Sequence, residues 1–345
     1  MTDVVIAGAA RTPMGGFQGD FATVEASELG GAAIKAAVED AGARPDQIEE
    51  LLMGCVLPAG QGQAPGGMES MTNAPYLLPK MRGGARIGHQ TVQDSMFLDG
   101  LEDAYDKGSL MGVFAELCAD KFNFSREMQD DYALGSLSNA LEAQKSGAFD
   151  GEIAPVTIKS RRGDQVIGAD EQPAKARPEK IPQLRPAFRK DGSVTAANAS
   201  SISDGAAALV MASAEATKAQ GLKVRARVLG HASHAQEPGW FTTAPVPAAQ
   251  KLLKKIGWSV SDVDLWEVNE AFAVVPMAFM HEMGIARDIV NVNGGACALG
   301  HPIGASGTRI MVTLLNALEK RGLKRGVAAI CIGGGEGTAI AIELP

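Results

Sequence analysis

The sequence has 345 residues, of which 46% are hydrophobic, and its formal net charge at neutral pH is −8. This length suffices for one large or two medium domains, each with a substantial core. The acidic balance excludes wholesale binding to nucleic acid or to an anionic membrane surface. The sequence shows neither an apolar run long enough to span a membrane nor the pattern of a signal peptide. We therefore expect a cytoplasmic protein with neither nucleic acid nor membrane among its partners.

The chain contains four scattered cysteines, which are Cys55, Cys118, Cys297 and Cys331. Their spacing matches no metal motif, and they are too few for a disulfide framework. We expect reduced thiols and no bound metal. An important cysteine in such a protein is a reactive thiol rather than a crosslink.

The N-terminal part predicts an alternation of strands and helices. The expected elements are a strand at 3–8, a helix at 25–41, a helical turn from Pro45, a strand at 51–57, helices within 109–147 and a strand at 152–158. Apolar residues recur at helical spacing in the first helix, and Gly42 follows as its C-cap. Ser125 is a typical helix start.

Residues 159–190 form a basic segment of a different kind. Six cations lie within sixteen residues that hold only one acid, Glu179; they are Lys175, Arg177, Lys180, Arg185, Arg189 and Lys190. Four prolines, at 173, 178, 182 and 186, exclude a regular helix there. Such a segment either receives the phosphates of a large cofactor or is a solvated surface loop, and charge alone leaves both interpretations open.

From residue 224 onward, the order of elements repeats that of the N-terminal part. The expected elements are strands at 224–231, 263–268 and 327–331 and helices at 247–256 and 308–318. This repetition predicts two duplicated α/β units. The copies differ in length, because 60 residues separate Phe272 from Gly333 whereas only seven separate Pro58 from Gly66. The first copy therefore lacks a loop, a helix and its last strand.

A glycine-rich stretch at 291–307 surrounds His301 and leads directly into the helix expected at 308–318. Glycines allow the backbone to approach a ligand closely, and a helix N-terminus presents free N–H groups. Histidine can exchange a proton near neutral pH. The stretch is therefore either a site for an oxyanion, acyl group or phosphate, or a tight turn with a capping histidine.

Six motifs define the resemblance of this chain to a known family. They are Asn269-Glu-Ala-Phe272, Gly300-His-Pro-Ile-Gly-Ala-Ser-Gly307, Cys331-Ile-Gly-Gly-Gly335, Ala9-Ala-Arg-Thr-Pro13, Gly66-Gly-Met-Glu-Ser-Met71 and Thr195-Ala-Ala-Asn-Ala-Ser200. Together they resemble the motifs of the thiolases, which are acyl-CoA C-acyltransferases. The resemblance covers nearly the whole chain and implies a layered αβαβα fold of two duplicated halves. The first half would comprise residues 1–65 and 66–223, with a loop domain at about 71–190, and the second residues 224–345.

The chemistry of this family explains the residue types. A reaction at the carbon of an acyl-CoA needs a nucleophilic cysteine, a base, and donors that hold an enolate oxygen. The resemblance implies that Cys331 is the base or acid, and that His301 activates the nucleophile and helps to hold the enolate oxygen. It implies that Asn269 positions a water as the other donor. The N–H of Gly333 would be half of a second oxyanion hole.

The same resemblance implies a set of binding residues. Ser200 would face the pantetheine arm, Lys180 and Arg185 would bind CoA, and Phe272, Phe241 and Met111 would line the narrow acyl end. Coenzyme A and acyl-CoA would be substrates, with no permanently bound cofactor. The family assembly would be a homodimer or homotetramer.

Each polar candidate also has a structural interpretation. Cys331 can be a small buried hydrophobic residue, Asn269 a turn former and Ser200 a turn hydroxyl. Glu270 is expected to orient a neighbour rather than to act in catalysis.

The main departure from the family lies at Pro65–Gly66. The family's Cys-Gly-Ser-Gly motif, which carries the nucleophile and starts a helix, belongs at this junction and is absent. The lost region also includes a strand that relatives pair across their dimer interface. Among the remaining cysteines, Cys297 is the candidate substitute, whereas Cys55 and Cys118 are expected in the core.

We therefore expect a thiolase-type acyltransferase of the acetoacetyl-CoA class that lacks normal turnover. One alternative is a non-catalytic CoA-binding homologue. Another is enolate protonation or thioester hydrolysis by His301 and Cys331. A third is a deletion product or an error in the gene sequence.

Overall fold

A computed structural model of the chain describes residues 3–59 and 67–345. The predicted junction at Pro65–Gly66 lies outside the described residues. The strands are β1 (Val4–Arg11), β2 (Gly15–Gly16), β3 (Met68–Ser70), β4 (Tyr76–Leu77), β5 (Gln93–Asp94), β6 (Val156–Ile158), β7 (Gln165–Ile167), β8 (Ser203–Ser213), β9 (Ala226–Ala235), β10 (Leu265–Val268), β11 (Arg325–Ile332) and β12 (Glu336–Glu343). The α-helices are α1 (Ala26–Ala41), α2 (Met111–Phe122), α3 (Arg126–Lys145), α4 (Glu171–Lys175), α5 (Ala214–Gln220), α6 (Pro245–Ile256), α7 (Val274–Met283), α8 (Ala296–Leu299) and α9 (Ser306–Arg321).

Most of the longer strands belong to one curled sheet in the order β10-β11-β12-β9-β1-β8-β2, and β3 also pairs with β8. The pair β10 and β11 is parallel, and the other pairs are antiparallel. The start of β1 connects the two halves, because it pairs with β8 on one side and with β9 on the other. Parallel strands require a crossover, and α7 to α9 provide the connection from β10 to β11.

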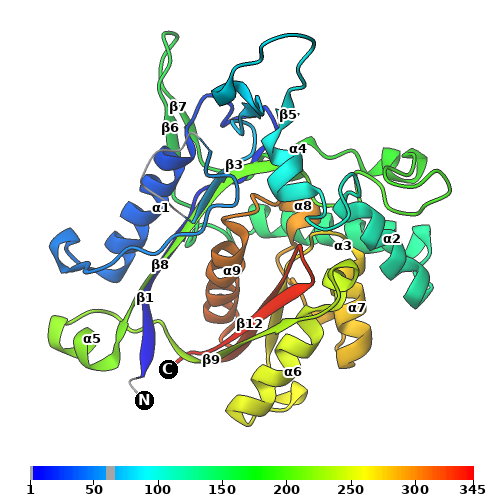
Figure 1. Cartoon of the computed structure of the whole chain (residues 1–345). Coiled ribbons are helices and arrows are strands. Elements are labelled where there is room, and N and C mark those ends of the chain that lie inside the picture. The colour runs from blue at the N-terminus through cyan, green and yellow to red at the C-terminus, as the bar shows by residue number, and fades with distance from the viewer. Residues whose placement is uncertain (1–2, 60–66) are drawn as a thin grey trace.

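Helix α9 lies at the centre of the molecule and contacts β1 and β8 on one side and β10 and β11 on the other (Figure 1). Helix α1 covers β1 and β8, and α6 covers β9, β11 and β12. The layers therefore follow the order helix, sheet, helix, sheet, helix. This arrangement confirms the predicted α/β architecture.

Local sequence rules account for several element ends. Helix α1 stops at Gly42, which adopts the left-handed conformation with φ of +67°. The hydroxyl of Ser125 accepts a hydrogen bond from the Met128 N–H and caps α3. Both ends were predicted from the sequence and are confirmed.

The prediction of a strand at 51–57 is wrong, because none of these residues belongs to a strand. Leu51 and Leu52 are 55% and 82% exposed, whereas the corresponding strand of the second half, β10, is fully buried. Strand β10 has a parallel partner in β11, and the described residues offer residues 51–57 no such partner. An apolar strand without a neighbour leaves its backbone groups unpaired, so its propensity alone cannot form the strand.

The basic segment also contains more structure than predicted. Its prolines do not exclude all helix, because α4 spans Glu171–Lys175 with Pro173 inside its first turn, and a 3-10 helix covers Pro178–Gln183. A proline in the first turn removes no intrahelical hydrogen bond. The strand predicted at 152–158 is shorter than expected and begins at Val156.

The close packing of α1 on β1 gives a stability prediction. A Cβ at Gly8 would lie 2.1 Å from the Ala37 carbonyl oxygen and 2.7 Å from the Ala41 nitrogen, whereas a Cβ at Gly31 on the exposed side of α1 would meet nothing within 4 Å. Gly8→Ala should therefore destabilise the protein by about 2–3 kcal/mol. Gly31→Ala, the matched control, should stabilise it by about 0.5–1 kcal/mol through helix propensity. Urea unfolding followed by circular dichroism measures both, and equal effects would contradict the packing.

Candidate active site

The C-terminal motifs meet where two parallel strands end. Asn269 follows β10, and Cys331 lies near the end of β11, so both residues are at the carboxyl edge of this part of the sheet. The N–H of Asn269 donates to the carbonyl oxygen of Ala329 at 2.9 Å, which joins the two strand ends. The loop between α8 and α9 then places His301 against Asn269.

The hydrogen bonds of His301 define which nitrogen carries its proton. The hydroxyl of Ser306 donates to the carbonyl oxygen of Pro302 at 3.0 Å, so it accepts from the Nδ1–H of His301 at 2.6 Å. The other nitrogen, Nε2, accepts from the Nδ2 of Asn269 at 3.2 Å. Burial and the nearby charge of Arg309 lower the pKa of His301 to about 4. At neutral pH, the imidazole is therefore neutral and its Nε2 can accept a proton.

Two further atoms complete this corner of the site. The Oδ1 of Asn269 is buried and has no hydrogen-bond partner among the described residues. A buried polar atom of this kind is suited to a ligand or a bound water. The thiol of Cys331 is 8% exposed, and burial raises its pKa to about 12. It is therefore a protonated thiol at neutral pH.

The residues expected at the acyl end do come together. Phe241 and Phe272 belong to the same buried cluster as Cys331, and Met111 packs against this cluster from the start of α2. A Cβ placed at Gly333 would lie 3.3 Å from the Sδ of Met111, so the β11–β12 turn faces the same wall. These residues form one apolar wall beside the strand ends.

The sequence analysis missed one member of this wall, Phe188. Its ring meets that of Phe272 edge to face, with centroids 6.0 Å apart. It also fills the space above Gly112, where a Cβ would lie 2.3 Å from the ring. Phe188 belongs to the basic segment, where the charge pattern drew attention away from it.

Ser200 lies beside the Asn269–Phe272 turn. Its backbone N–H and its hydroxyl both donate to the carbonyl oxygen of Ala271, at 3.0 and 2.9 Å. The next residue, Ser201, accepts from the N–H of His301 at 3.1 Å. The strand-end turn, the serine segment and the histidine loop are thus one connected structure.

A pocket of about 320 Å³ lies next to this structure, and three cations lie on its rim. These are Lys175, Arg177 and Lys180, and the lining also includes Ser201 and Cys297. Lys180 therefore lies at the pocket, whereas Arg185 is exposed and is not part of its lining. A cavity of this size with a cationic rim suits an elongated anionic ligand.

The remaining cysteines do not approach His301 by hydrogen bonding. The thiol of Cys297 points to the carbonyl oxygens of Asn198 and Glu270, at 3.7 and 3.8 Å, and burial raises its pKa well above the usual value. Burial also raises the pKa of Cys118 to about 11, and burial together with the charge of Glu69 raises that of Cys55 to about 12. A nucleophilic cysteine has the opposite shift.

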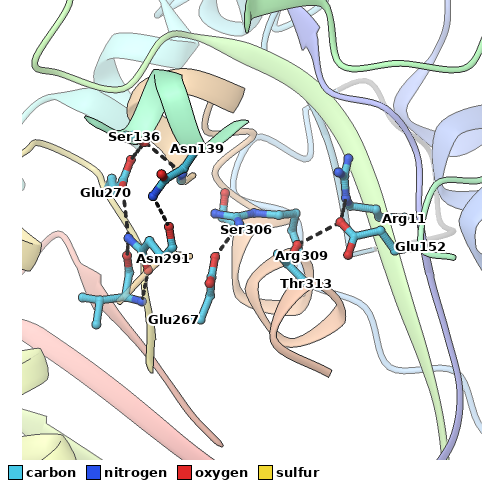
Figure 2. A network of polar contacts seen from close by, with 12 residues as sticks. Arg11, Ser136, Asn139, Glu152, Glu267, Glu270, Asn291, Ser306, Arg309 and Thr313 are labelled. Carbon is cyan, nitrogen blue, oxygen red and sulfur yellow. Dashed lines mark hydrogen bonds and ion pairs between the residues drawn. The ribbon is translucent and has the colours of Figure 1, made fainter. Parts of the chain in front are cut away.

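Buried ion pairs hold α9 behind the site (Figure 2). Arg309 donates to Glu267 on β10 at 3.0 Å, and both side chains are almost fully buried. One turn further along α9, the Thr313 hydroxyl donates to Glu152 at 3.1 Å, and Glu152 accepts from Arg11 at 2.6 Å. These contacts join the helix that follows His301 to β10 in one half of the curled sheet and, through Glu152, to β1 in the other.

The described part of the chain offers neither a metal site nor a membrane-spanning helix. Among residues 3–59 and 67–345, no group of three or more His, Cys, Asp or Glu side chains is arranged to hold a metal ion. Within the same residues, no helix combines the length and apolarity needed to cross a membrane.

Comparison with known families decides the membership. The N-terminal domain of the thiolases matches residues 4–65 and 64–215, and their C-terminal domain matches residues 222–344. The chain belongs to the thiolase family. Thiolases are acyltransferases, and the family and fold predicted from the motifs are confirmed.

Individual thiolases match over almost the entire chain. Acetyl-CoA acetyltransferase 2 of Arabidopsis thaliana is 44% identical over 392 aligned positions, which cover 99% of this chain and 97% of the relative. The acetyl-CoA acetyltransferase of Cupriavidus necator is 42% identical over 392 positions, covering 99% of this chain and all of the relative. The structure of the Bacillus anthracis acetyl-CoA acetyltransferase superposes with a TM-score of 0.96 at 37% identity, covering 100% of this chain and 99% of that one. Human mitochondrial 3-ketoacyl-CoA thiolase gives 0.94 at 34% identity with the same coverage.

The hydrogen bonds of His301 make a spectroscopic prediction. Long-range ¹H–¹⁵N correlation spectra at pH 7 should show His301 neutral with its proton on Nδ1, and its titration midpoint should lie near pH 4. Ser306→Ala removes the acceptor of that proton, so a mixture of the two tautomers should appear. His301→Gln assigns the resonances among the five histidines of the chain. A midpoint near 6.5, the value of an unperturbed imidazole, would contradict the described environment.

Proposed function

We propose that this chain is an acetyl-CoA acetyltransferase-type thiolase that binds acyl-CoA but lacks the segment carrying the nucleophilic cysteine. The acetyl-type assignment rests on the relatives, several of which are named acetyl-CoA acetyltransferase. The crowded wall of Phe188, Phe241 and Phe272 supports a short acyl group. A cytoplasmic location and a homodimeric or homotetrameric assembly stay predictions from the sequence.

The observation that carries the proposal is the break in the family match. The N-terminal thiolase domain is matched in two pieces, which meet at residues 64 and 65. The alignments with relatives span 392 positions although the chain has 345 residues, so those relatives contain residues with no counterpart here. The exposed, irregular segment at 51–57 also supports the loss of a neighbouring strand.

Within this proposal, the retained residues handle the enolate. In a site that also contains the nucleophilic cysteine, a cationic His301 and the water held by Asn269 would stabilise the enolate oxygen, and Cys331 would move a proton at the α-carbon. The N–H of Gly333 provides half of the oxyanion hole for acyl transfer. Support comes from the His301–Asn269 hydrogen bond and from the position of Cys331 beside the apolar wall.

Binding of the CoA portion uses the cationic pocket. Its rim residues Lys175, Arg177 and Lys180 receive phosphate, and Ser200, the neighbour of the lining residue Ser201, faces the pantetheine arm. Arg185 stays an exposed candidate for a peripheral contact. Binding without thioester exchange is the result that this combination predicts.

The missing nucleophile also disables the residues that remain. In the proposed mechanism, His301 becomes cationic by taking a proton from the cysteine thiol. Its lowered pKa keeps it neutral here, with the proton on Nδ1, so Nε2 cannot donate to an enolate oxygen. Residues that act as a unit lose most of their effect together.

The first test is acylation and turnover. Incubation with acetyl-CoA followed by intact mass spectrometry should show no cysteine-linked acetyl group. Acetoacetyl-CoA cleavage should be about four to six orders of magnitude below that of the Cupriavidus necator relative, measured in parallel. Calorimetry should still show CoA binding, and Lys180→Glu should weaken it. A stable adduct on Cys55 or Cys297 together with turnover would refute the proposal, and α-proton exchange of acetyl-CoA without an adduct would instead favour a pure enolisation activity.

The second test restores the segment. Insertion of the corresponding residues of the Cupriavidus necator relative between Pro65 and Gly66 should raise acetoacetyl-CoA cleavage by at least about a thousandfold, because the nucleophile then faces His301. The matched control carries the same insert with its nucleophilic cysteine changed to serine and should stay inactive. Equal activity of the two inserted proteins would show that the missing thiol is not the cause of the low turnover.

A further inference from the structure

Asn291 lies at the start of the glycine-rich stretch and is fully buried beside β10. It adopts the left-handed conformation with φ of +50°, which asparagine tolerates better than other side chains. Its backbone N–H donates to the carbonyl oxygen of Trp266 at 2.9 Å. The chain therefore turns away from β10 at this residue while its side chain stays against the strand.

The side-chain amide continues the hydrogen bonding of the sheet. Its Oδ1 accepts from the N–H of Val268 at 2.7 Å, and its Nδ2 donates to the carbonyl oxygen of Val268 at 2.8 Å. Both backbone groups of one residue are satisfied, as they would be by a neighbouring strand. β10 is the edge strand of the sheet, so the Asn291 amide acts as its missing neighbour at the last residue.

The second Nδ2 proton fixes the direction of the amide. It is donated to Glu270 Oε1 at 2.9 Å, as Figure 2 shows. Glu270 in turn accepts from the hydroxyls of Tyr132 and Ser136, at 2.9 and 2.7 Å, and from the N–H of Cys297 at 3.0 Å. A carboxylate held by four donors allows only one orientation of the Asn291 amide.

Asn269 lies between Val268 and Glu270, which are both hydrogen-bonded to the Asn291 amide. The N–H of Asn269 itself donates to the carbonyl oxygen of Ala329 on β11. The backbone at Asn269 is therefore held by Asn291 on one side and by β11 on the other. From this backbone position, its Nδ2 lies 3.2 Å from Nε2 of His301. These hydrogen bonds thus set the backbone position from which the Asn269 side chain reaches His301.

We propose that Asn291 is a positioning residue that aims the Asn269 amide at His301. The role rests on the proposed function only in that Asn269 and His301 are taken as the ligand-facing pair. Nothing in the role requires turnover. It can therefore be tested in the inactive chain.

The geometry explains why this position needs an amide. An aspartate has the same shape but cannot donate to Val268, and its charge would face the Glu270 carboxylate. A glycine removes all four side-chain bonds, including a 3.3 Å bond from Nδ2 to the Tyr132 hydroxyl, while accepting the same backbone conformation. Asn291→Gly therefore isolates the loss of the amide, and Asn291→Asp reverses its donors at constant volume.

The experiment follows the His301 titration by long-range ¹H–¹⁵N spectra. A donor to the Nε2 lone pair favours the neutral ring, so loss of the Asn269 bond should raise the midpoint. Asn269→Ala should raise it by about one pH unit, and Asn291→Gly should raise it by most of the same amount. The double variant should match Asn269→Ala alone, because Asn291 acts through Asn269.

Two controls separate positioning from general stability. Asn139→Ala removes only a 3.4 Å bond to the backbone oxygen of Asn291 and should leave the midpoint unchanged. Urea unfolding reports the stability of each variant independently of the midpoint. Additive shifts in the double variant, or an unchanged midpoint in Asn291→Gly while Asn269→Ala shifts, would overturn the proposal. If Asn291→Asp does not fold, the midpoint of Asn291→Gly alone decides whether the positioning role holds. A lack of acyl-CoA binding in the unsubstituted chain would refute only the proposed function.

Discussion

The structure depends on the placement of α9 between the two halves of its curled sheet. The contacts that place it are polar and buried: Arg309 with Glu267 on one side, and Thr313 with the Glu152–Arg11 pair on the other. Buried ion pairs cost desolvation energy that their attraction offsets only when the geometry is good, so their main effect is to select one position. With α9 fixed, the loop that precedes it has one path, and His301 comes to lie against Asn269. The site is thus a consequence of helix placement.

The two halves differ in how their corresponding strands are paired. In the second half, β11 pairs in parallel with β10 and antiparallel with β12, and both neighbours are regular. In the first half, β8 corresponds to β12, and β3 pairs with only three of its residues on that side. Residues 51–57, which correspond to β10, form no strand and expose Leu52. Hydrogen bonds from Val56 and Leu57 to the buried Glu69 carboxylate replace the ladder there.

Sequence reasoning succeeded where a local rule sufficed. Gly42 and Ser125 end and begin helices through backbone conformation and capping, and the strands before Asn269 and Cys331 are short buried apolar runs. It failed at 51–57 because strand formation depends on a partner distant in sequence. The resemblance named Phe241, Phe272 and Met111, which do cluster, but Phe188 is recognisable only once the chain brings it to Phe272. The tautomer of His301 could not be predicted, because it depends on where Ser306 directs its own proton.

A preserved half-site does not imply half of the activity. The Nε2 atom of His301 carries a lone pair, and the pKa of the imidazole is about 4. The group hydrogen-bonded to Nε2 is the Asn269 amide, which cannot supply a proton at neutral pH. An enolate oxygen placed there would face an acceptor rather than a donor, which costs energy instead of stabilising the transition state. Under the proposed function, the missing cysteine thiol would therefore have been both the acyl carrier and the source of the proton that converts His301 into a donor. The Asn269–His301 geometry can persist without it, because Asn291 and Ser306 hold that geometry from within the second half.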